Sequence, residues 1–218
     1  MKVPAFPVYL FDVDGTLMDS AEDIIGAVDE VLLRRVGRRP AFEHTRRFIG
    51  RHLRDLFQEF KPDITPAEVD DWVAEYRGIY LERGHRKTRP FPGVADALSR
   101  LGGRKSTATT KGTPTTRAVL DQFGLLAYFD HVQGTDGFPA KPEPDVVLRS
   151  LELFGARPAE CLFVGDSAAD MEAGRRAGVK LCAARYGYGN IDEMARFTPD
   201  YWIDDLRELV VEPPLPSR

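Results

Sequence analysis

The amino-acid sequence predicts an α/β fold with a mostly parallel sheet, interrupted after its first strand by a small helical module. The first observation is a set of short, continuous apolar runs, which are typical of parallel strands covered on both faces. The first two of these runs are followed by polar segments that contain glycine. The second observation is that amphipathic helical patterns, each followed by a glycine, lie between the runs. Strands that alternate with helices are typical of an α/β domain.

The predicted core elements follow one another along the chain. Strands are expected at 8–11, 161–164 and 179–184, and helices at 94–101, 115–123, 146–154 and 171–177. The segment 105–110 lies where a further strand is needed, and its threonines favour strands. Nothing in it is strongly apolar, however, so its pattern alone predicts a loop. The proline-rich end, 212–218, is expected to fray.

Residues from about 20 to 87 break the alternation. Apolar side chains recur at helical spacing over 24–32, 53–60 and 69–80, and no strand pattern separates them. Prolines and a glycine within 89–93 mark the return to the core. We therefore expect residues 1–18 and 89–218 to form the α/β core and residues 19–88 to form an inserted helical domain.

Composition narrows the class of protein. The chain has 218 residues, of which 43% are hydrophobic and 29% charged, and its formal net charge of −4 argues against a general nucleic-acid binder. The apolar run near the N-terminus is too short for a secretion signal or a membrane span. Cys161 and Cys182 each adjoin an apolar run, which predicts buried free thiols. We expect a cytoplasmic protein with no nucleic-acid or membrane partner.

The strongest chemical signal directly follows the first strand. Asp12 and Asp14 lie two residues apart in Asp-Val-Asp-Gly-Thr-Leu, at the sheet edge where open α/β folds bind ligands. Two carboxylates suit a hard cation with oxygen ligands, and they also suit a nucleophile beside a proton donor. The structural alternative is a turn that uses aspartate and glycine for their backbone preferences alone.

A second acidic cluster follows another predicted strand. Asp166 lies at the end of that strand and Asp170 lies one helical turn later, so we expect both carboxylates on one side. The alternative is that Asp166 or Ser167 caps the helix that follows. Capping and metal binding are compatible, so the two interpretations do not exclude each other.

Two further segments can face a phosphate. Lys141 precedes the helix near Val146 and could neutralise phosphate charge, although a lone lysine is more often a surface residue. Thr109 and Thr110 precede another helix, where hydroxyls and backbone N–H groups form an anion site.

The four segments occur in the order found in one enzyme superfamily. The chain resembles the haloacid dehalogenase-like hydrolases over nearly its whole length, with segments similar to the four family motifs at 12–16, 109, 141 and 165–170. The inserted helices resemble the small cap of the phosphoglycolate phosphatase and β-phosphoglucomutase branch. The segments 91–93, 141–144 and 186–189 are most similar to the phosphoglycolate phosphatase group. This resemblance implies a Rossmann-like parallel-sheet core with an inserted small α-helical cap domain.

The resemblance also implies a mechanism for a phosphatase. Asp12 would be the nucleophile that forms an aspartyl-phosphate, and Asp14 would protonate the leaving alkoxide and then activate water. Mg²⁺ would be held by Asp12, the backbone carbonyl of Asp14 and Asp166. Asp170 would support these ligands rather than bind the metal itself.

By the same resemblance, Lys141 would stabilise the charge on the nucleophile and on the transferring phosphoryl group, and Thr109 would hold its oxygens with amides near Thr110. The family usually has an apolar strand before the second motif and asparagine after its threonine. Here the strand is polar and Thr110 occupies that place, so either Thr109 or Thr110 is the residue of the second motif.

The cap is expected to select the substrate, a small phosphorylated metabolite, because it closes over the leaving group. Phe48–Arg51 is similar to the loop of the cap that faces the substrate. Arg47 or Arg51 could bind a substrate carboxylate through paired hydrogen bonds, whereas the structural alternative is a solvated helix face.

Several other functions share these motifs. The leading substrate is 2-phosphoglycolate, and the alternative is a phosphatase or phosphomutase for a sugar phosphate, pyrophosphate or nucleoside monophosphate. Asp14 argues against a dehalogenase, a branch that generally lacks this second aspartate. A phosphonate hydrolase would need a lysine in the cap. The cap offers Lys61, but this residue lies in a predicted turn, which argues against that function. A binding module that retains the fold without activity is the non-enzymatic alternative.

Overall fold

A five-stranded parallel sheet forms the centre of the core. The computed structural model describes residues 2–210. The strands lie in the order β4-β1-β5-β6-β7, with bounds Val8–Phe11 (β1), Arg104–Thr107 (β4), Cys161–Gly165 (β5), Lys180–Ala184 (β6) and Tyr201–Ile203 (β7). The strands predicted at 8–11, 161–164 and 179–184 are all present, whereas the short edge strand β7 was not predicted.

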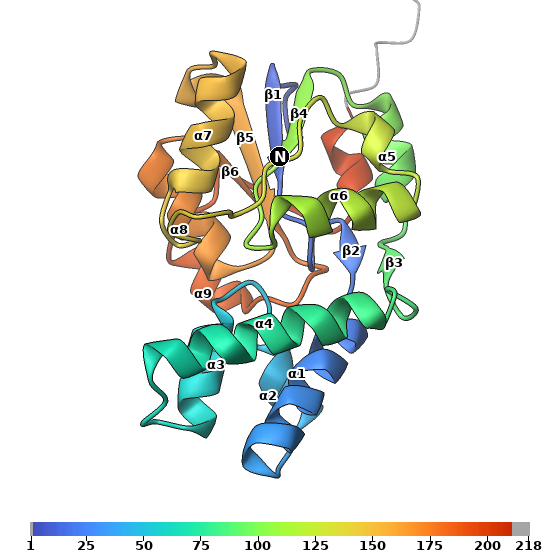
Figure 1. Cartoon of the computed structure of the whole chain (residues 1–218). Coiled ribbons are helices and arrows are strands. Elements are labelled where there is room, and N and C mark those ends of the chain that lie inside the picture. Colours follow the sequence, from blue (N-terminus) through green and yellow to red (C-terminus); the bar gives the residue numbers. More distant parts are fainter. Residues whose placement is uncertain (1, 211–218) are drawn as a thin grey trace, which may run out of the picture.

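Both faces of the sheet are buried under helices, which explains the continuous apolar runs. Along β1, Tyr9 and Phe11 point into one apolar cluster while Val8 and Leu10 point into the other. The helices that cover the sheet are α5 (Val94–Arg100) and α6 (Thr113–Gln122) on one face and α7 (Asp145–Phe154) and α8 (Ala168–Ala177) on the other (Figure 1). All four of these helices were predicted from the sequence.

Strand β4 corrects the loop that composition alone predicts for 105–110. It pairs in parallel with β1, and Ala108 N continues the ladder by donating to Phe11 O at 2.7 Å. The side chains of Lys105, Ser106 and Thr107 are buried in spite of their polarity, and they have partners: Thr107 Oγ1 donates to Gln133 O at 2.9 Å, for example. The strand is therefore held by backbone pairing and hydroxyl bonds, which an apolar pattern cannot reveal.

The inserted segment folds into helices that share an apolar cluster of their own. These helices are α1 (Ala21–Val36), α2 (Phe42–Arg46), α3 (Leu53–Phe60) and α4 (Pro66–Glu82). Val28, Leu56 and Trp72 are buried in this cluster, which is separate from the two that flank the sheet. The short helix α2 was not predicted. We propose that residues 19–88 form one domain, the cap, because its helices are packed on one another.

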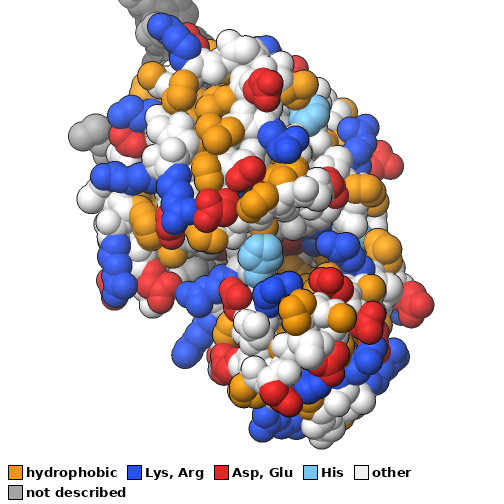
Figure 2. All heavy atoms as spheres, turned by 60° about the vertical axis from the view of Figure 1, so that its left-hand side comes forward, with side chains coloured by type: hydrophobic (Ala, Val, Ile, Leu, Met, Phe, Trp, Pro, Cys, Tyr) orange, Lys and Arg blue, Asp and Glu red, His pale blue; other side chains and the backbone are white. Residues whose placement is uncertain are grey.

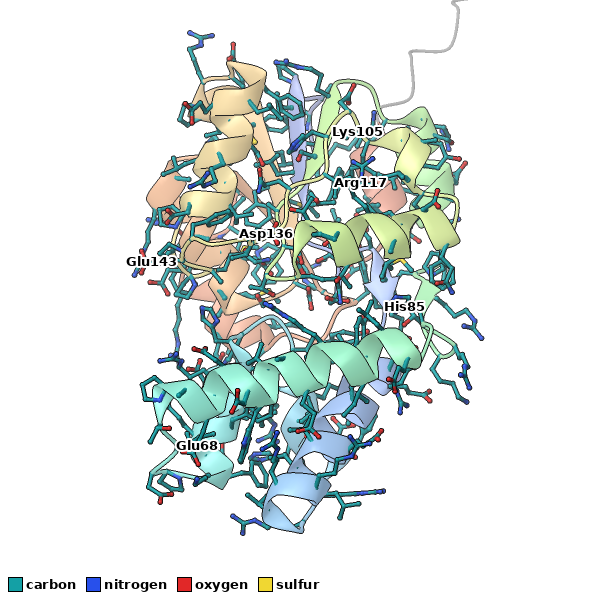
Figure 3. The ribbon with its side chains drawn as sticks, in the orientation of Figure 1. Glu68, His85, Lys105, Arg117, Asp136 and Glu143 are labelled. Atoms are coloured by element: carbon teal, nitrogen blue, oxygen red, sulfur yellow. The ribbon has the colours of Figure 1, made fainter. Side chains whose placement is uncertain are left out.

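Two short strands connect the cap to the core. β2 (Met18–Asp19) and β3 (Arg89–Pro90) pair in an antiparallel ribbon. Helix α4 crosses the cap beneath the sheet, from Glu68 near its start to His85 just beyond its end (Figures 1 and 3). Buried Asp23 anchors the return linker, since its Oδ2 accepts from the backbone N of Lys87 at 2.9 Å and of Thr88 at 2.8 Å.

The remaining predictions concern the surface and the cysteines. The smaller elements are η1 (Leu126–Tyr128), η2 (Pro158–Glu160), α9 (Ile191–Ala195) and η3 (Leu206–Leu209). Cys161 and Cys182 are buried and free, as predicted. Within residues 2–210, none of the helices has the length and apolar character needed to cross a bilayer. The tail predicted to fray, 212–218, lies outside the described residues.

Candidate functional site

Acidic side chains gather at the carboxyl ends of β1 and β5. These strands are neighbours in the sheet, and Asp12 N extends their pairing by donating to Val164 O at 2.9 Å. Ligand oxygens of Asp12, Asp166 and Asp170 all lie within 4.8 Å of one another, and each of these residues is buried. The structure thus brings together three of the aspartates singled out in the sequence.

The turn after β1 is shaped around Asp166. Gly15 has a φ of 96°, and a Cβ at this position would lie 2.3 Å from Asp166 Oδ2. Glycine is therefore required both by its backbone conformation and by the close approach of the carboxylate. The next residue, Thr16, donates its hydroxyl to Asp166 Oδ1 at 3.0 Å. The turn orients Asp166 toward Asp12 as well as reversing the chain.

A fully buried lysine lies among the carboxylates. Lys141 Nζ donates to Asp12 Oδ1 at 2.6 Å, to Asp170 Oδ1 and to the carbonyl of Ala108 at 3.0 Å. Burial by itself would lower the pKa of Lys141, but the charges of Asp12 and Asp170 hold it above its ordinary value. Lys141 is therefore charged, and it offsets part of the negative charge in the site.

The carboxylates are more numerous than the cations that face them. Burial, with a smaller contribution from the charge of Asp170, raises the pKa of Asp12 to about 7 in spite of Lys141. Burial also raises the pKa of Asp166, with additional contributions from the charges of Asp170 and Asp12. A cluster of three carboxylates and one ammonium retains protons or attracts a further cation. Buried carboxylate oxygens are ligands that Mg²⁺ and Ca²⁺ prefer.

Asp170 has a structural task in addition to its place in the cluster. Ser167 is the N-cap of α8, and its hydroxyl accepts from Asp170 N at 3.2 Å. In return, Asp170 Oδ2 accepts from Ser167 N at 2.9 Å and from Ser167 Oγ at 2.6 Å. The capping interpretation from the sequence therefore describes Ser167 correctly, and it coexists with the acidic cluster.

Asp14 lies outside the acidic cluster and borders a cavity. Its Oδ1 accepts from Ser20 Oγ at 2.6 Å, and its Oδ2 lies 3.1 Å from Lys111 Nζ. Lys111 in turn donates to the hydroxyl of Tyr80, a residue of helix α4, at 3.0 Å. Asp14 is therefore held between core and cap, by Ser20 on one oxygen and Lys111 on the other.

The threonines of the second candidate segment follow β4. Thr109 is buried, and its Oγ1 accepts from Lys111 N at 3.3 Å. Its carbonyl accepts from Thr135 Oγ1 at 2.9 Å. Thr110 lines the cavity next to Asp14. Of the two candidates for the second motif, Thr110 therefore shares the cavity lining with Asp14, whereas Thr109 is buried and is not part of that lining.

The cavity lies between the core and the cap and has a volume of about 570 Å³. Its core wall includes Asp14, Thr110 and Lys111, and its cap wall includes the aromatic rings of Tyr76 and Tyr80. The cationic and imidazole side chains that line it are Arg51, His52, Arg54, Arg77 and Lys111, and the acidic ones are Asp14 and Asp70. The lining is therefore suited to an anion. On the outer face in Figure 2, by contrast, basic and acidic side chains are interspersed.

The two cap arginines proposed from the sequence lie in different places. Arg51 lines the cavity and forms an exposed ion pair with Glu193 of the core at 3.3 Å. Arg47 is exposed and is not part of the lining. Sequence reasoning missed Lys111, although it directly follows Thr109 and Thr110, and it counted Tyr80 only as part of an apolar helix face.

Comparisons with known proteins agree with the arrangement. The model of the haloacid dehalogenase-like hydrolase family matches residues 9–184. The chain is 35% identical to a phosphoglycolate phosphatase of Aquifex aeolicus over 93% of its own length and 94% of the relative, and 36% identical to one of Pseudomonas putida over 92% and 77%. A solved structure of a predicted phosphoglycolate phosphatase from Haemophilus somnus superposes with a TM-score of 0.83 at 27% identity, covering 94% of this chain and 96% of that one.

Proposed function

This chain belongs to the haloacid dehalogenase-like hydrolases and is a phosphatase, and on that premise we propose that it hydrolyses 2-phosphoglycolate through an aspartyl-phosphate on Asp12. The observation that carries the proposal is the position of Asp12: buried at the end of β1, bonded to Lys141 at 2.6 Å and clustered with Asp166 and Asp170.

In the proposed first step, a carboxylate oxygen of Asp12 attacks phosphorus while the bond from phosphorus to the ester oxygen breaks. Asp14 gives its proton to the departing alkoxide. In the second step, Asp14 takes a proton from water, the water oxygen attacks phosphorus, and the bond to Asp12 breaks to release phosphate. Asp14 lines the cavity in which we propose that the leaving group lies, and this position supports it in the role of proton donor.

The donor set fits Mg²⁺. Three buried carboxylates facing one ammonium supply hard oxygen ligands and excess negative charge. We propose that Asp12, Asp166 and the backbone carbonyl of Asp14 would hold the ion, with Asp170 in support. When bound, Mg²⁺ would neutralise charge on the phosphoryl oxygens and orient them for attack.

Residues of the core would balance the charge of the phosphoryl group that the metal ion does not neutralise. Lys141 keeps the carboxylate of Asp12 in place and adds positive charge where the phosphoryl group is transferred. We propose that Thr109 holds equatorial oxygens of the phosphoryl group together with backbone amides near Thr110. These contacts would position the group rather than take part in bond exchange.

The cavity supports a substrate with an anionic leaving group. Lys111 lies beside Asp14, and Arg51 lines the cap side. Because the ion pair of Arg51 with Glu193 is exposed and weak, the guanidinium can turn to a substrate carboxylate. We therefore propose Arg51 for this contact in preference to Arg47. The names of the curated relatives agree with a small acidic phosphate ester.

The test is phosphate release from 2-phosphoglycolate, with Mg²⁺ present and with it chelated. We expect release that needs Mg²⁺ and is abolished in Asp12→Asn, while Asp63→Asn, which changes an exposed carboxylate, retains wild-type activity. A panel of sugar phosphates, pyrophosphate and nucleoside monophosphates completes the assay. Preference for one of those compounds would overturn the substrate, and undiminished activity in Asp12→Asn would overturn the nucleophile.

A further inference from the structure

We propose that Tyr188 and Ser20 together position the carboxylate of Asp14, so that Tyr188 acts on the reaction without touching the substrate. This inference rests on the role proposed above for Asp14 as proton donor. Its starting point is an unusual helix start. Ser20 is the N-cap of α1, yet its side chain makes no capping hydrogen bond. Serine at this position ordinarily accepts from a backbone N–H of the first turn.

A hydroxyl from a distant loop holds the start of α1 instead. Tyr188 Oη accepts from Ser20 N at 2.7 Å and from Ala21 N at 3.1 Å, and it donates to Asp19 Oδ1 at 2.6 Å. A phenolic hydroxyl has one donor and two acceptor positions, so all of its hydrogen-bonding capacity is used here. One atom thus fixes three consecutive residues where the chain passes from core to cap.

As a consequence, the hydroxyl of Ser20 is not needed to cap the helix. Since Oγ does not cap the helix, it donates to Asp14 Oδ1 at 2.6 Å. Ser20 is buried, so its side chain and its backbone N–H form their hydrogen bonds with protein groups rather than with solvent. With Ser20 on one oxygen and Lys111 on the other, the carboxylate of Asp14 has a single orientation at the cavity wall.

The backbone of Tyr188 contacts the other side of the site. Its N–H donates to Asp166 Oδ2 at 2.7 Å, and its ring lies beside Phe91 in the return linker. The guanidinium of Arg46, a cap residue, lies 5.3 Å from the centroid of the ring. Tyr188 therefore connects the acidic cluster, both linkers and the cap. Replacement by phenylalanine removes only the hydroxyl and leaves these other contacts intact.

A positioning role has a kinetic signature. A proton donor matters greatly for a basic alkoxide leaving group and little for p-nitrophenolate, which leaves without protonation. The quantity to measure is kcat/KM for 2-phosphoglycolate divided by kcat/KM for p-nitrophenyl phosphate. Because kcat/KM covers the steps up to release of the first product, hydrolysis of the aspartyl-phosphate does not enter this ratio.

We expect Tyr188→Phe to lower this ratio about tenfold, a part of the 10²- to 10⁴-fold contribution typical of a positioned proton donor. Ser20→Ala should lower it as much, the double variant should lower it no further, and Ser20→Thr, which keeps a hydroxyl, should restore it. The matched control is Tyr186→Phe. It removes a hydroxyl that lies in the same loop and donates to Thr16 O. It should leave the ratio unchanged.

An unchanged ratio in Tyr188→Phe, or equal losses on both esters, would overturn the inference and leave a merely structural role. A lowered ratio in Tyr188→Phe but not in Ser20→Ala would overturn the route through Ser20. Asp14→Asn separates this inference from the function on which it rests. If Asp14→Asn does not lower the ratio, both fall; if it does while Tyr188→Phe does not, only the positioning role falls.

Discussion

Replacing Lys141 by methionine tests how much of the structure depends on charge balance in the acidic cluster. The side chain is fully buried and donates to Asp12, to Asp170 and to the carbonyl of Ala108. Removing one partner of a buried ion pair costs about 3–5 kcal/mol, because the remaining charge stays buried without compensation. For a chain of this size, such a loss lowers the melting temperature by on the order of 10 °C.

The loss of stability should depend on pH, and its direction follows from Asp12. The pKa of Asp12 is raised to about 7 by burial, and removal of Lys141 raises it further. For an acid whose pKa is higher in the folded state, stability decreases as pH rises from the unfolded pKa, about 3.9, toward the folded one. The deficit of Lys141→Met should therefore be largest above pH 7 and smaller near pH 5.

The assay is urea denaturation at both pH values with a chelator present, so that no metal ion compensates the charge. Lys105, labelled in Figure 3, is the matched control as Lys105→Met, because its side chain is also poorly exposed but, within residues 2–210, donates only to the carbonyl of Gly103. We expect a small deficit there, equal at both pH values. Equal stability of Lys141→Met and wild type at pH 8, or a deficit that does not change with pH, would refute the reasoning.

Further predictions follow from single contacts. Gly15→Ala places a Cβ 2.3 Å from Asp166 Oδ2 at a φ of 96°, so we expect a loss of about 1–3 kcal/mol in urea denaturation and at least a tenfold loss of kcat; near wild-type values would contradict this. Mg²⁺ should raise the melting temperature more at pH 8 than at pH 6, because protons compete with it for Asp12; equal shifts would argue against a site that includes Asp12. Lys111→Met should lower kcat/KM for 2-phosphoglycolate about tenfold more than for 2-hydroxyethyl phosphate, which lacks the carboxylate; a loss of this size is typical of one charged contact. Equal losses on both substrates would mean that Lys111 acts only on Asp14 and does not bind the substrate carboxylate.

The sheet and its acidic edge could be predicted because both depend on local patterns. Strands buried on both faces require uninterrupted apolar residues, as in 8–11 and 161–164, and the residue that directly follows β1 or β5 (Cys161–Gly165) lies at the edge where ligands bind. Asp12 and Asp166 are such residues, and neighbouring parallel strands bring them together. The local patterns thus indicated an acidic site, and the resemblance to the haloacid dehalogenase-like hydrolases added the phosphate chemistry.

Other parts depend on contacts between distant residues and leave no local pattern. Strand β4 can be polar and still buried because distant partners such as Gln133 accept hydrogen bonds from its hydroxyls. The sequence of 104–107 contains no pattern that predicts those partners. The contact of Tyr188 with Ser20 joins residues separated by 168 positions. Lys111 is an intermediate case, since its neighbours Thr109 and Thr110 were singled out but its carboxylate partner lies in another loop.

The hydrogen bonds of Asp166 and Asp170 differ, and the difference bears on the roles that we propose for these two residues at the metal site. Asp166 accepts one donor on each oxygen, from Thr16 and from the backbone of Tyr188, so each oxygen retains a lone pair. Asp170 accepts two donors from Ser167 on one oxygen and Lys141 on the other. Asp170 Oδ1 also retains a lone pair, but a cation bound there would lie beside the ammonium of Lys141, and displacing Lys141 would remove charge compensation from Asp12. This difference supports our proposal that Asp166 binds the metal ion and that Asp170 supports the ligands.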